Sequence, residues 1–162
     1  MASTKIPLEL TAYAPDADGA TLELQTTDTT VTDGSVLGKI EFKAPKEASG
    51  TDAILVGAAI EAVAEGTFAA DNNATELVFK TGASEAAAQK MVLTSAGNVG
   101  IGTTPTLGAL HVTSATNDIV TFENTSSGTT GAQLALFHNS SSPADGDRVG
   151  ALTFQGDDDG GN

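Results

Sequence analysis

The residues best suited to hold a metal ion form two acidic clusters near the end of the chain. Asp145-Gly146-Asp147 and Asp157-Asp158-Asp159 offer carboxylate oxygens, the ligands that calcium prefers. Neither cluster has the longer, regularly spaced set of ligands ending in glutamate that an EF-hand loop requires. We therefore interpret both as solvated acidic loops and predict no metal site.

The two histidines and a pair of glycines are candidates for other chemistry. His111 and His138 lack partners at metal-ligand spacing, so packing on a strand face is the favoured interpretation. Gly100-Ile101-Gly102 lacks the third glycine of a dinucleotide-binding fingerprint, and Pro105 blocks the helix that would follow. No nucleophile elbow is present among the many serines. We predict no catalytic residue and no cofactor.

The charge balance of the 162-residue chain limits its partners. The formal net charge is −14, and only seven residues are lysine or arginine. Phosphates of nucleic acids and anionic lipids would repel such a surface, so neither nucleic acid nor membrane is an expected partner. The chain has no cysteine, which excludes disulfides and cysteine-based zinc sites.

The apolar residues are mostly small. Alanine, valine, leucine and isoleucine dominate, with six phenylalanines, one tyrosine and no tryptophan. Together with abundant threonine, serine, glycine and aspartate, this composition is typical of thin, turn-rich β structure. Because a thin core buries little apolar surface, we expect the chain to assemble with other copies.

Alternation of apolar and polar residues predicts an all-β fold. Strands are expected at Lys5–Ala12, Ala20–Thr26, Val36–Lys43 and Thr75–Lys80.

One further segment mixes helix and strand signals. Ala53–Glu65 is rich in alanine and lies between an aspartate and a glycine, which suits a helix. Its isoleucines and valines recur at even positions, and we therefore favour a strand. For Ser84–Gln89 we expect at most one helical turn, capped by Ser84.

Met91–Val112 is the segment around which the chain is organised. Strands are expected at Met91–Leu93 and Ala109–Val112, and three glycines stand between them among β-branched residues. In that setting glycine indicates positive φ, a bulge or the close approach of another backbone. The expected structural turn element comprises Gly97, Asn98, Gly100, Gly102 and Pro105.

The chain repeats itself at an offset of 112 residues, and apolar and turn positions match without a gap over about 45 residues. The repeat-core pairs are Leu22 with Leu134, Leu24 with Leu136, and Phe42 with Phe154, and Gly38 matches Gly150. We therefore expect an N-terminal arm (1–5), one complete β unit (6–112) and the start of a second copy (113–162). Because the strands that should complete the second copy are missing, we predict that a longer protein continues beyond these residues.

The segment Ser95–Pro105, followed by Leu110-His111-Val112, resembles the GNVGIGTT element of bacteriophage tail fibres and related virion appendages, especially those of aquatic phages. Gly38–Phe42, Gly150–Phe154 and Glu76–Phe79 resemble further strands of these proteins. The resemblance implies repeated β-sandwich or β-prism-like units interwoven in a homotrimer. It also implies a virion protein, made in the host cytoplasm without a signal peptide.

The leading functional hypothesis is a structural virion protein and not an enzyme: the N-terminal attachment and shaft part of a trimeric fibre or appendage used in host adhesion. Its expected partners are two further copies, other tail or capsid proteins, and the host cell surface through a distal region. One alternative is a capsid decoration protein, a cement or spike. A second is a polysaccharide-degrading tailspike, which would require paired carboxylates in a groove.

Overall fold

The computed structural model describes residues 21–44, 50–116 and short stretches between 119 and 154. The chain divides into two compact units, Met1–Ile119 and Val120–Asn162. The strand expected at Lys5–Ala12 lies outside the described residues, as do both acidic clusters.

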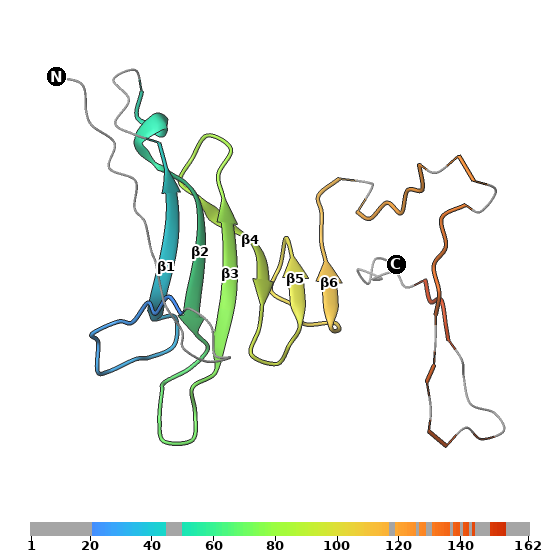
Figure 1. The fold of residues 1–162 in the computed structure, drawn as a ribbon, viewed down its shortest axis with the longest axis horizontal. Helices are drawn as coiled ribbons and strands as arrows, with labels where there is room; N and C mark the ends of the chain where they lie inside the picture. The colour runs from blue at the N-terminus through green and yellow to red at the C-terminus, as the bar shows by residue number, and fades with distance from the viewer. Residues whose placement is uncertain are drawn as a thin grey trace, which may run out of the picture. The chain divides into compact units, whose positions relative to one another are not determined.

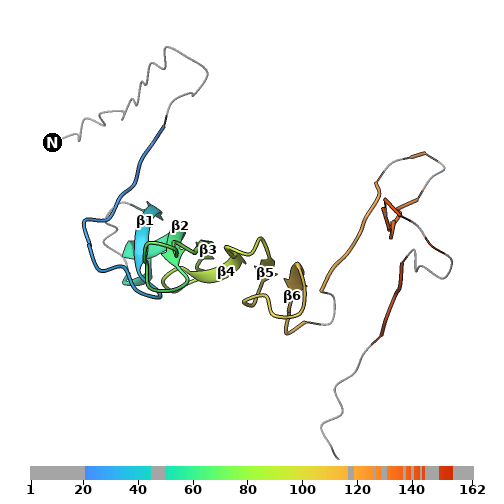
Figure 2. The same cartoon turned by 90° about the horizontal axis from the view of Figure 1, so that it is seen from below.

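The first unit contains one six-stranded sheet with the strands in chain order, β1 to β6 (Figure 1). The strands are β1 (Val36–Lys43), β2 (Val56–Ala64), β3 (Thr75–Thr81), β4 (Ala88–Leu93), β5 (Val99–Ile101) and β6 (Leu110–Val112). Neighbours from β1 to β5 pair antiparallel, whereas β6 pairs parallel to β5. Figure 2 looks along the strands and shows them in a single layer. The all-β prediction is confirmed for the described residues, whose one helical segment is the short 3-10 turn Asp52–Ile54.

Most of the ambiguous segment Ala53–Glu65 forms β2, so the strand prediction is confirmed there, whereas Ala53 and Ile54 belong to the 3-10 turn. Ile60 is registered with Ile40 of β1 on one side and with Phe79 of β3 on the other. Both edges of β2 are therefore hydrogen-bonded to neighbours. This pairing outweighs the helix preference of its alanines, since tertiary context routinely overrides local propensity.

At Ser84–Gln89, where the sequence predicts at most one helical turn, the structure has none. Residues 82–87 form an irregular connection, and Ala88 and Gln89 already belong to β4. The ends of the connection are tied to β2: the Gly82 N–H donates to the Gly57 carbonyl (3.0 Å) and the Ala87 N–H to the Val56 carbonyl (2.9 Å). These bonds tie both ends of the segment to β2, and the segment between them connects β3 to β4 without a helical turn.

The strand expected at Ala20–Thr26 is also not observed, because residues 21–26 form no strand. The segment instead brings Leu24 onto Gly38 of β1: a Cβ atom added to Gly38 would lie 2.7 Å from the Leu24 Cβ. Alternation predicted that Leu24 would contact other apolar groups, but it did not specify a hydrogen-bonded partner strand.

The described residues of the second unit contain no strand. They do repeat one contact of the first unit. A Cβ atom added to Gly150 would lie 2.7 Å from the Leu136 Cβ, the same distance as for Gly38 and Leu24. The two pairs occupy positions 112 residues apart in the sequence.

Candidate functional site

Two rows of apolar residues cross all six strands on one face of the sheet. The strand register aligns Gly38, Ala62, Leu77, Leu93, Val99 and Leu110 in the first row, and Ile40, Ile60, Phe79, Met91, Ile101 and Val112 in the second. None of the twelve is polar or charged. We call these two rows the apolar face. Such a surface is suited to association with another apolar surface and not to acid–base chemistry.

The apolar face is substantially exposed. Leu77 and Leu93 are each 37% exposed, Ile101 is 41% exposed and Leu110 is 66% exposed. Leu24 rests on this face and lines an apolar hollow together with Ile60, Leu77 and their neighbours. A patch of large apolar side chains that crosses a whole sheet is unusual on a soluble monomer and indicates an interaction site.

The opposite face is built differently. Its middle row aligns Lys39, Glu61, Val78, Val92, Gly100 and His111 across the six strands. Val78 is 2% exposed and Val92 is fully buried. With Ala59 and Ala64 they are the buried apolar residues of the described part of the chain, so the core is thin. Ala59, Val78 and Val92 lie on this side of the sheet, whereas Ala64 lies on the side of Ile60 and Ala62.

Charged groups on β1 to β3 lie beside this thin core. Lys80 and Glu61 form an ion pair of 2.5 Å in which Glu61 is buried. Lys39 and Glu41 form a second pair of 2.5 Å, which is exposed. A hydrogen bond from Lys39 lowers the pKa of Glu41. Exposed pairs of this kind contribute little stability, whereas breaking a buried pair is costly.

The predicted turn element joins β4, β5 and β6. The Gly97 N–H donates to the Thr94 carbonyl and the Thr94 N–H to the Asn98 carbonyl, both at 2.9 Å, which closes a three-residue hairpin loop. Gly97 has a φ of 80°, the left-handed conformation that such loops require. The Glu65 carboxylate at the end of β2 accepts a hydrogen bond from the Ser95 N–H (3.1 Å) and fixes this loop to the sheet.

Two glycines allow the chain to fold back from β5 to β6. A Cβ atom on Gly100 would lie 2.1 Å from the Thr103 carbonyl oxygen and 2.8 Å from Pro105 Cδ. Gly102 has a φ of 74°, and a Cβ atom there would lie 2.4 Å from the Thr113 carbonyl oxygen. The loop after β5 therefore covers Gly100 and with it the end of the buried row.

His111 has a structural contact in the first unit. Its Nδ1 accepts a hydrogen bond from the Thr106 N–H at 3.3 Å, which links the covering loop to β6. His138 lies in the second unit. In the part of the chain that the structure describes, no three histidine, cysteine, aspartate or glutamate side chains are placed to hold a metal ion.

Three carboxylates, those of Asp33, Glu65 and Glu76, line a hollow at one end of the sheet. Burial raises the pKa of Glu76, and Glu65 and Asp33 raise it further. Glu76 therefore binds its proton more tightly in the folded chain than in the unfolded chain. Its ionisation opposes folding at neutral pH.

We expect Glu76→Gln to increase the free energy of unfolding at neutral pH by up to about 0.5 kcal/mol. The gain decreases as pH falls through the folded pKa, and it disappears once Glu76 is protonated in both states. Urea unfolding at neutral pH and at about pH 3 checks this expectation. A gain that is equal at the two pH values would contradict it.

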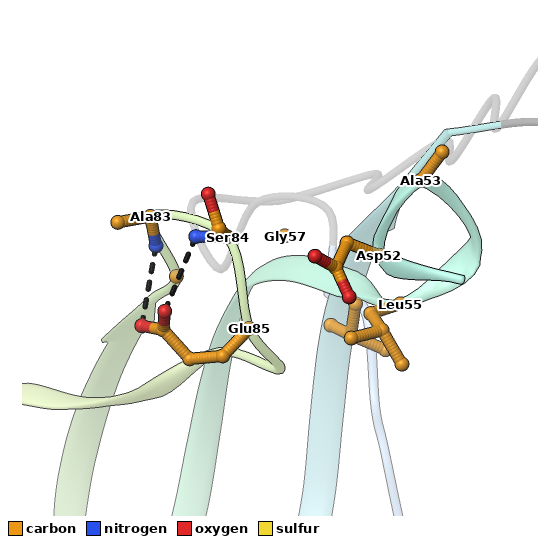
Figure 3. Close-up of a pocket in the computed structure, with 9 residues that line it drawn as sticks. Asp52, Ala53, Leu55, Gly57, Ala83, Ser84 and Glu85 are labelled. Carbon is orange, nitrogen blue, oxygen red and sulfur yellow. Dashed lines mark hydrogen bonds between the residues drawn. The ribbon is translucent and has the colours of Figure 1, made fainter. Parts of the chain in front are cut away.

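A second hollow lies at the opposite end of β2 and β3 and provides a control for that experiment (Figure 3). The Glu85 carboxylate accepts hydrogen bonds from the N–H groups of Ser84 (3.2 Å) and Ala83 (3.3 Å), which lower its pKa. Its ionised form therefore favours folding. We expect Glu85→Gln to decrease stability at neutral pH, with the effect disappearing as pH falls.

The residues predicted as the repeat core are exposed in the single chain. Leu22, Leu24, Phe42, Leu134, Leu136 and Phe154 are all between 47% and 87% exposed. The structure brings Leu24 onto the apolar face beside Gly38, and Phe42 follows Ile40 on the same side of β1. These residues form no core within the described part of one chain.

Sequence reasoning missed the apolar face as a continuous surface. The signal lay in alternate positions of Thr75–Thr81 and Met91–Leu93, whose apolar residues were identified strand by strand. Only the register showed that they align across six strands.

Comparisons with known proteins identify no relative: no family model matches the chain, and no curated protein shows significant similarity. Among the described residues there is no helix of the length and apolarity needed to span a bilayer.

Proposed function

We propose that this protein is a structural, non-enzymatic component of a bacteriophage fibre or appendage, the attachment and shaft part of a homotrimer that serves host adhesion. The observation that carries the proposal is the thin core of the described sheet. Two alanines and two valines are its buried apolar residues, while larger ones remain exposed. A sheet of this kind is stabilised when neighbouring copies cover it.

Two further observations support a fibre built from repeated units. The GNVGIGTT segment, on which the resemblance to phage fibres rests, forms the turn and loop that join β4, β5 and β6. The contact of Leu24 with Gly38 recurs between Leu136 and Gly150, at positions that the repeat relates. Three linked chains would also present three distal binding regions, which raises avidity without any new contact.

The absolute mass of residues 1–162 in solution tests this proposal. Light scattering on a sizing column is expected to give the mass of three chains. A compact, folded monomer at every concentration would contradict the fibre proposal and favour the capsid decoration protein.

The tailspike alternative rests on one feature, the hollow lined by Asp33, Glu65 and Glu76. Paired carboxylates, one with a raised pKa, are what glycoside hydrolysis requires. However, Glu65 is engaged by the Ser95 N–H, and the residues that line the hollow include no aromatic side chain on which a sugar could stack. Hydrolysis of host polysaccharide that is lost in Glu76→Gln would favour this alternative over the structural role.

A further inference from the structure

Much of the apolar face remains exposed in the single chain. Leu24 lies over Gly38 at the β1 edge, and the exposed residues Leu77, Leu93, Ile101 and Leu110 lie on β3 to β6. On β3 and β4 the opposite face buries Val78 and Val92, whereas the apolar face leaves Leu77 and Leu93 exposed. The larger apolar side chains of these strands are therefore the ones that lack a cover in the single chain.

Charge indicates what can cover the apolar face. The chain carries a formal net charge of −14, so two copies repel each other wherever their acidic surfaces meet. The twelve residues of the apolar face bear no charge, and the ion pairs of the sheet lie on the other side. A basic partner would be attracted by the net negative charge and would gain nothing from an uncharged face. A second copy of the same chain can bring its own uncharged face into contact without like-charge repulsion.

The shape of the face also suits a copy of itself. Gly38 and Ala62 leave a hollow beside Leu24, Ile60 and Leu77, whereas Leu93, Ile101 and Leu110 are exposed farther along the face. An exposed leucine or isoleucine of one copy can enter the hollow of another, which is how apolar surfaces reach interior packing density.

We propose that the apolar face is the surface through which copies of this chain pack against one another, with its two rows buried at the centre of the assembly. The proposal rests on the proposed function, which requires that the protein assembles from identical chains. It adds which residues form the interface, and it places the opposite face of the sheet, with the ion pairs of β1 to β3, on the outside.

Matched charge substitutions on the two faces of β4 test this proposal. Leu93→Glu places a carboxylate within the first row, and Gln89→Glu places one on the other face of the same strand, where Gln89 is registered with Lys80. Burying an unpaired carboxylate against an apolar partner is costly, so we expect Leu93→Glu to weaken assembly by about 100-fold or more. Gln89→Glu adds the same charge and is expected to leave the mass of the assembly unchanged. Ile101→Glu tests the second row in the same way.

Cysteine labelling answers the same question without adding a charge. Because the chain contains no cysteine, Leu93→Cys and Gln89→Cys each introduce a single reactive thiol. In the assembled protein we expect maleimide to react rapidly with Gln89→Cys and slowly with Leu93→Cys, and dilution below the assembly threshold to abolish this difference. This measurement decides the question even if Leu93→Glu fails to fold.

The outcomes separate the two proposals. A wild-type assembly that persists in Leu93→Glu and Ile101→Glu, with both thiols equally reactive, would overturn the interface and leave the proposed function standing. A wild-type chain that is monomeric at every concentration would overturn both. Loss of assembly in the row variants alone supports both.

Discussion

Gly100→Ala is expected to lower the free energy of unfolding by about 3 kcal/mol or more, or to prevent folding altogether. The added methyl group would lie 2.1 Å from the Thr103 carbonyl oxygen and close to the Pro105 ring. The nearest of these groups is backbone, so it cannot swing aside as the end of a flexible side chain could. To make room, the loop after β5 must lift away from Gly100 and from the sheet.

Gly108→Ala is the matched control, because it makes the same change in the loop that lies against Gly100. Nothing lies within 4 Å of a Cβ atom at Gly108, so a change of less than about 0.5 kcal/mol is expected. Urea unfolding of both variants at one protein concentration makes the comparison, since the stability of an assembly depends on concentration. Equal stability of the two variants would show that the loop does not hold the conformation described here.

The conformations of Gly97, Gly100 and Gly102 were predicted only in part from the sequence. Glycines among β-branched residues predicted close backbone approach or positive φ, and the structure has positive φ at Gly97 and Gly102. The spacing did not reveal that the backbone approaching Gly100 belongs to Thr103, only three residues later. It also did not reveal the parallel pairing of β5 with β6, because a strand at Ala109–Val112 is compatible with either direction.

The strand predictions were accurate where the alternation of apolar and polar residues is regular, and inaccurate where it is interrupted. Val36–Lys43 was predicted with the bounds that β1 has, and Thr75–Lys80 differs from β3 by one residue. β4 begins three residues before the expected Met91, because a register shift between Phe79 and Lys80 breaks the alternation at its start. A bulge changes which side chains share a face, and a search for period-two alternation cannot detect that change.

Which face is buried could not be predicted from the pattern. On β3 and β4 both faces carry apolar residues: Val78 and Val92 on one side, Leu77 and Leu93 on the other. The structure buries the Val78 side, and the loop after β5 lies against Gly100 in the same row. The expectation of a thin core followed from composition alone, and the buried set of two alanines and two valines agrees with it.

The ion pair of Glu61 with Lys80 is expected to give the second large effect on stability. Glu61 is 8% exposed, and the Lys80 ammonium lies 2.5 Å from its carboxylate. Lys80→Met leaves a buried carboxylate with only Lys39 opposite, and we expect a loss of about 2–4 kcal/mol. Glu61→Gln leaves the half-exposed lysine, which can reach water, and should cost less, about 1–2 kcal/mol.

The double variant Glu61→Gln, Lys80→Met completes the cycle. Because neither charge then remains uncompensated, we expect it to be more stable than the sum of the single losses predicts, by about 1–2 kcal/mol. Glu41→Gln applies the same exchange to the exposed pair with Lys39 and should change stability little, since solvent screens such a pair. If Glu61→Gln cost no more than Glu41→Gln, the pair would be no more than a surface contact. The stability of that side of the sheet would then come from burial of Val78 and Val92 and not from the ion pair.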